Sequence, residues 1–106
     1  MFPLTISQDI VKYLHEVKGF SEQEIADIIS MPVDYVQGIT KGINTLNQAS
    51  IGSLIEKSDE PMIAILSKAC PESHIKTYLP EKLSKNIMLY KHIQKVKKKN
   101  ENKSGK

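Results

Sequence analysis

The chain has 106 residues, of which 40% are hydrophobic and 25% charged, so its length and composition predict a single globular domain. Its longest apolar run, residues 62–66, is too short to cross a bilayer, so we expect no membrane contact. Residues 91–106 contain seven lysines and one glutamate, whereas the preceding residues contain eight lysines and eleven acidic residues. We therefore expect a mildly acidic body and a basic C-terminal segment.

Apolar residues at helical spacing predict a first helix over residues 7–19. Ile10, Val11 and Leu14 share one face, Ser7 is a suitable N-cap, and Gly19 is a suitable end. No alternation typical of a strand is visible here or later in the chain, so we predict an all-α fold.

Residues 21–42 predict two short helices joined by a tight turn. Ser21 and Glu24 form the S-x-x-E pattern of a capping box, in which each side chain binds the other residue's backbone N–H. Pro32 suits the start of the second helix, and Gly42 suits its end in the left-handed conformation. Ala26 is small enough to let the two helices cross closely. We predict helices over residues 22–29 and 32–40, the arrangement of a helix-turn-helix.

This segment resembles the helix-turn-helix of the phage-repressor and Cro-like class of DNA-binding proteins. The residues that carry the resemblance are Ser21, Ile25, Ala26, Ser30, Met31, Val36, Ile39 and Gly42. The resemblance covers roughly residues 8–70. It implies a five-helix bundle, a DNA-binding function and a dimer that reads two half-sites.

The polar positions of the motif depart from the family pattern. Glu22 replaces a glutamine, Gln37 replaces an outward serine, and Thr40 replaces a glutamate. Residues 21–42 hold four acidic residues and one lysine, Lys41. Because neutralisation of phosphates supplies much of the affinity for DNA, either neighbouring elements supply positive charge or the motif binds something else.

Four more helices are predicted after the motif. The first is expected over residues 46–57, with Asn44 or Thr45 as its cap, and the second opens near Pro61 after a cap at Ser58 or Asp59. A short helix is expected over 72–78 and an amphipathic helix over 81–98. The predicted fold is therefore an all-α, five-helix repressor-like bundle with an additional C-terminal helix. Residues 1–79 form the helix-turn-helix domain, residues 80–99 the amphipathic helix, and residues 100–106 a disordered basic tail.

The last helix carries Leu83, Ile87 and Tyr90 along one side. Because the preceding five helices already complete the domain, we expect this side to form the interface of a homodimer. Packing of the same side on the first helix of its own chain is the alternative.

Residue patterns for catalysis or metal binding are sparse. Cys70 and His74 are four apart, but Pro71 follows the cysteine and no second pair exists, so we expect no metal site. No catalytic triad spacing or Gly-rich phosphate loop is visible, so we expect neither an enzyme nor a bound cofactor. The single cysteine and the absence of a secretory pattern in Met1–Leu4 predict a cytoplasmic location.

Two functions remain open. The first is a transcriptional regulator that binds double-stranded DNA through Ser21, Val33, Tyr35, Gln37, Thr40 and Lys41. Further, non-specific contact with nucleic acid is expected from Lys95, Lys97, Lys98 and Lys99. The second is a protein-contact module, in which the acidic face or the last helix binds a protein partner.

Overall fold

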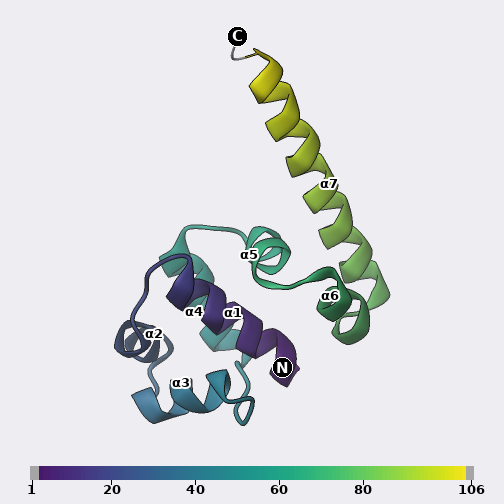
Figure 1. The fold of residues 1–106 in the computed structure, drawn as a ribbon. Coiled ribbons are helices and arrows are strands. Elements are labelled where there is room, and N and C mark those ends of the chain that lie inside the picture. Colours follow the sequence, from purple (N-terminus) through teal and green to yellow (C-terminus); the bar gives the residue numbers. More distant parts are fainter. Residues whose placement is uncertain (1–2, 105–106) are drawn as a thin grey trace.

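The computed structural model describes residues 3–104, with side chains up to Lys97, and is entirely helical apart from its turns over that range (Figure 1). The helices of this range are α1 (Leu4–Glu16), α2 (Glu22–Ile29), α3 (Val33–Thr40), α4 (Gln48–Ser58), α5 (Met62–Ala69), α6 (Glu72–Tyr78) and α7 (Glu81–Ser104). The all-α prediction is confirmed. No helix in the described range is long and apolar enough to cross a membrane.

Helix α1 occupies the centre of the bundle and packs on α2, α3, α5 and α6 (Figure 1). Its buried face includes Ile6, Ile10 and Leu14. The helix begins earlier than expected, with Pro3 as its N-cap, so the prediction that Ser7 caps it is wrong. Ser7 is instead fully buried, and its Oγ accepts a hydrogen bond from the backbone N–H of Leu46 at 3.0 Å. The sequence pattern at Ser7 predicted an N-cap, but the Ser7 hydroxyl instead forms a hydrogen bond to the distant loop before α4.

Helices α2 and α3 form the predicted pair. The capping box is present: Ser21 Oγ accepts from the Glu24 N–H at 3.0 Å, and Glu24 Oε1 accepts from the Ser21 N–H at 3.0 Å. Ser30, in the turn between the helices, has the left-handed φ of 58°, and Gly42 ends the pair with a φ of 77°. Pro32 is the N-cap of α3 and precedes its first residue.

Helix α4 is capped differently from the prediction. Asn47 Oδ1 accepts from the Ser50 N–H at 2.8 Å, so neither Asn44 nor Thr45 caps this helix. Asn44 instead donates from Nδ2 to the carbonyl of Tyr35 at 3.1 Å. The short helix α6 has the bounds that the sequence predicted.

Helix α7 packs on α5 and α6 and then extends beyond the bundle (Figure 1). Ile87 is fully buried within one chain, and Leu83 packs against the core. Ile87 is therefore covered within its own chain, and α7 packs mainly on α5 and α6 rather than on the first helix that we named as the alternative. Dimer formation itself stays a prediction. The exposed apolar side chains of α7 are Leu89, Ile93 and Val96.

The end of α7 also differs from the prediction. The helix continues to Ser104, so residues 100–104, which we expected to belong to a disordered tail, are helical. Residues 105 and 106 of that expected tail lie outside the described residues.

Ala26 is fully buried on α2, which packs on both α3 and α4. We predict that Ala26→Leu lowers the free energy of unfolding by about 1–3 kcal/mol, because the larger side chain overpacks this crossing. Urea denaturation measures the effect. Ala49→Leu, the same substitution at an exposed position of α4, is the control, and equal stability of the two variants would contradict the close crossing.

Glu60 joins α1 to α5 from the turn before α5. Its carboxylate accepts from the Tyr13 hydroxyl at 2.8 Å and lies 2.6 Å from the Lys68 ammonium and 3.4 Å from that of Lys18. Burial raises the pKa of Glu60, but the bonds from Lys68, Tyr13 and Lys18 outweigh it, so the pKa lies below its ordinary value of 4.5. The charged carboxylate therefore stabilises the fold above pH 4.5, and this contribution is lost as the pH falls through the lowered pKa.

We predict that Glu60→Gln destabilises the protein by about 1–3 kcal/mol at neutral pH, because charge-assisted hydrogen bonds are lost. The difference from the original chain should shrink as the pH falls through the lowered pKa of Glu60, because the original carboxylate then becomes protonated itself. Denaturation at neutral pH and at a series of acidic pH values measures it, with the exposed Glu56→Gln as control. A difference that stays constant over this pH series refutes the electrostatic role.

Candidate nucleic-acid interface

The outer side of α3 presents a row of three residues, Val33, Gln37 and Lys41. They are spaced four apart, so they lie on successive turns of the same side of the helix. Lys41 is exposed, whereas Val33 and Gln37 are half-buried. Gln37 Nε2 lies 3.5 Å from Glu22 Oε1, which is a long hydrogen bond that leaves the amide free to bind elsewhere. This row places an aliphatic group, an amide and an ammonium group on one side of α3, although Val33 also packs against the core.

The other three residues that we predicted to contact DNA have their side chains in bonds within the chain. The Tyr35 hydroxyl donates to the Thr45 carbonyl at 2.7 Å, and the ring packs against the core. Thr40 Oγ1 donates to the backbone carbonyl of Gln37 at 2.8 Å. Ser21 Oγ is part of the capping box. These side chains fix the shape of the motif, so the structure places only half of the predicted set in the exposed row.

Two polar residues that sequence reasoning did not assign to this site hold α3 in place. Gln8 Nε2, on α1, donates to the Thr40 carbonyl at 2.6 Å. Asn44 packs so closely on Gly38 that a Cβ at that position would overlap its Nδ2 atom. A glycine inside an otherwise regular helix was the available signal, because it indicates that another group approaches the backbone closely.

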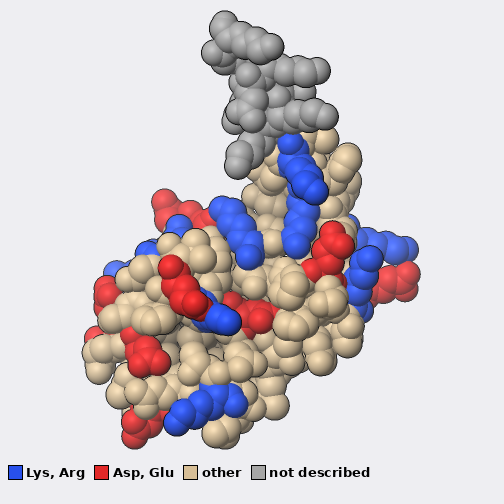
Figure 2. Space-filling view, viewed as in Figure 1, with Lys and Arg blue, Asp and Glu red and all other residues tan. Residues whose placement is uncertain are grey.

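The surface around α3 is acidic. Glu22, Glu24 and Asp27 belong to α2, and Asp34 is exposed in the first turn of α3. Within the described part of the chain, none of these four carboxylates forms an ion pair. Figure 2 shows acidic side chains over the lower left of the molecule, where Figure 1 places α2 and α3. Their charge opposes the approach of phosphates.

The lysines of α7 lie far from this surface. Lys95 and Lys97 are exposed, and the side chains of Lys98 and Lys99 lie outside the described residues. The C-terminal part of α7 points away from α2 and α3 (Figure 1), and the molecule extends 48 Å along its longest axis. The described lysines of this set, Lys95 and Lys97, therefore lie away from the α2–α3 surface that we expected to contact the same DNA molecule.

A cluster of titratable residues lies on the other side of α1. His74 Nδ1 lies 2.7 Å from Asp9 Oδ2, and its ring meets that of Tyr78 edge to face at 5.9 Å. Cys70 is buried beside them; burial, followed by the charge of Asp9, raises the pKa of its thiol to about 12. In the part of the chain that the structure describes, no group of three or more His, Cys, Asp or Glu side chains could hold a metal ion. The cluster joins α1 to α6.

We predict that Cys70 reacts slowly with a thiol reagent at pH 8, because the reactive thiolate is scarce when the pKa is near 12 and the thiol is buried. Absorbance of the released reagent anion, in buffer and in denaturant, measures the reaction. Ser73→Cys adds an exposed thiol on α6 and should release one rapid equivalent in the native state. Equal rates for Cys70 in the native and unfolded chains would refute the prediction.

Comparisons of this chain with protein-family models, with curated proteins and with solved structures found no match. The resemblance to the repressor and Cro-like class, over roughly residues 8–70, therefore stays a prediction.

Proposed function

We propose that this chain is a small DNA-binding regulator whose α3 lies in the major groove of duplex DNA. The observation that carries the proposal is the α2–α3 pair, with its left-handed turn at Ser30 and the row of Val33, Gln37 and Lys41 on its outer side. A helix that presents one side to solvent fits the major groove, where an amide binds adenine and an aliphatic group contacts the thymine methyl.

Each residue of the row has a role in this proposal. Gln37 recognises a base through its amide, Val33 contacts a thymine methyl, and Lys41 binds a phosphate. The nearby carboxylates reduce the affinity, so we expect binding that is modest in strength.

A second candidate is a protein-contact module, and the four carboxylates around α3 favour it. A surface of one charge sign attracts a partner of the opposite sign, and these carboxylates have no cationic partner among the described residues. The partner would then be a basic protein surface.

Removing carboxylates near α3 should have opposite effects in the two functions: it should strengthen binding to DNA and weaken binding to a basic protein surface. We predict that Glu22→Gln with Asp34→Asn tightens binding to a duplex selected from random sequences, because two charges that repel phosphates are removed. Gln37→Ala should weaken binding to the same duplex by about 1–3 kcal/mol. Fluorescence anisotropy at two salt concentrations measures both effects. Glu56→Gln with Glu81→Gln removes the same charge on α4 and α7 and is the control.

If selection enriches no sequence, or the Glu22 and Asp34 substitutions leave binding unchanged relative to the control, α3 does not read DNA. A bound protein partner that is released by Glu22→Lys with Asp34→Lys would then establish the second function.

A further inference from the structure

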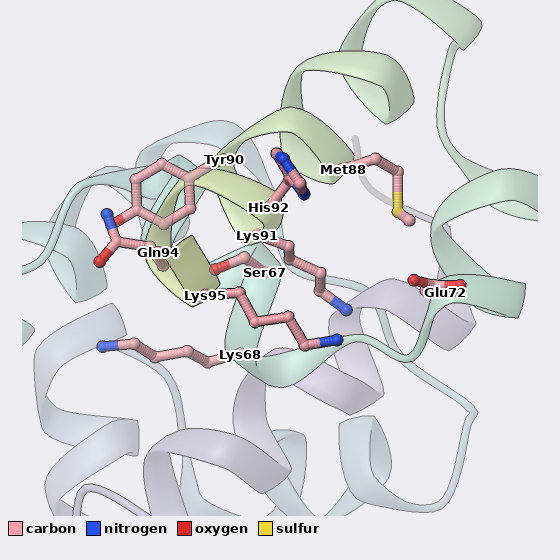
Figure 3. A pocket seen from close by; sticks show the side chains of 9 residues that line it. All are labelled: Ser67, Lys68, Glu72, Met88, Tyr90, Lys91, His92, Gln94 and Lys95. Atoms are coloured by element: carbon pink, nitrogen blue, oxygen red, sulfur yellow. The ribbon is translucent and has the colours of Figure 1, made fainter. Parts of the chain in front are cut away.

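A groove between α5 and α7 forms a hollow of about 630 Å³ on the side of the molecule where α7 leaves the bundle (Figure 3). Its polar lining includes Lys68 from α5, Lys91 and Lys95 from α7, and Glu72 from α6. Figure 2 shows basic side chains gathered where α7 leaves the bundle. Positive charge is therefore concentrated in a concave part of the surface, which strengthens its field.

The three lysines differ in the bonds that they make. Lys68 is held by Glu60, and Lys91 Nζ donates to the carbonyl of Cys70 at 3.3 Å. Lys95 makes no hydrogen bond or ion pair within the described residues. Figure 3 shows Lys91 and Lys95 extending in the same direction from successive turns of α7. Two neighbouring ammonium groups thus face the hollow, and only one carboxylate, that of Glu72, lines it.

Other groups in the groove suit a phosphate-bearing ligand. Gln94 offers an amide as a neutral hydrogen-bond donor and Tyr90 offers an aromatic ring, whereas the Ser67 hydroxyl already donates to the Ala64 carbonyl at 2.8 Å. Basic grooves with an aromatic residue are the surfaces on which single-stranded nucleic acids bind, with phosphates on the cations and bases on the rings. The bond from Lys91 to the Cys70 carbonyl also neutralises the negative end of α5, which would otherwise repel an anion.

We propose that this groove binds closely spaced phosphate groups, with Lys91 and Lys95 as the main contacts. The phosphates belong either to a free polyphosphate or to the backbone of a single-stranded nucleic acid, because both present several negative charges at short spacing. The site is built from α5 and α7 and does not depend on the proposed reading of duplex DNA by α3.

Titration of the full chain with inorganic tripolyphosphate, and separately with a short single-stranded oligonucleotide, tests the proposal. Amide NMR signals of Ser67, Glu72 and Lys95 should shift, and those of α2 and α3 should not. Lys91→Gln with Lys95→Gln should weaken binding about tenfold or more, because charge-assisted bonds to phosphate are lost. Lys95→Gln alone tests the site without disturbing the bond to α5.

Lys82→Gln with Lys85→Gln is the matched control, since it removes the same charge from the same helix outside the groove. If the control variant still binds tripolyphosphate, the groove is a site for a free polyphosphate. If it still binds the oligonucleotide but tripolyphosphate does not bind, the groove is a site for a nucleic-acid backbone. If the control weakens binding as much as the groove variants, or if the groove signals do not move, the lysines are merely solvated and the proposal is overturned. Gln37→Ala should leave this binding unchanged, which separates it from the function proposed for α3.

Discussion

The rest of the structure depends on the burial of α1 between two groups of helices. Its apolar face is covered on one side by α2 and α3 and on the other by α5 and α6. Two consecutive polar residues of α1 form hydrogen bonds that orient the neighbouring segments. Ser7 accepts from the N–H of Leu46, and Gln8 donates to the carbonyl of Thr40. A buried N–H without a partner costs free energy, so Ser7 fixes where the loop before α4 must lie. The position of α3 is therefore determined by α1 as much as by its own sequence.

This arrangement separates the charges of the molecule. The α2–α3 surface carries carboxylates without ion-pair partners in the described part of the chain, whereas the α5–α7 groove carries lysines. The two surfaces lie on opposite sides of the central α1, so one small partner cannot contact both. A single formal charge of +3 for the whole chain describes neither surface. Because screening limits charge effects to about 8 Å at physiological salt, the charge of one surface has little effect at the other.

The local signals of the α2–α3 pair predicted its structure correctly. The capping box at Ser21 and the glycine end at Gly42 involve groups within three or four residues, and both are present. The sequence did not predict features that depend on distant groups. Ser7 had the chemistry of an N-cap, yet its partner lies 39 residues away. Ile87 had the spacing of an interface residue, but a buried apolar side chain has the same pattern whether its own chain or a second one covers it.

The same limit applies to the candidate site. Sequence position cannot distinguish a tyrosine that faces DNA from one like Tyr35, whose hydroxyl holds the following loop. Only Val33, Gln37 and Lys41 remain in the row on the outer side of α3, with Lys41 exposed and the other two half-buried. Each well-placed pair with a base discriminates by about 1–3 kcal/mol. The nearby carboxylates repel every duplex equally, because phosphates carry no sequence information. In the proposed function these carboxylates would lower the affinity for all sequences while leaving the discrimination by Gln37 intact, so the proposed regulator would be selective for a sequence without binding DNA tightly.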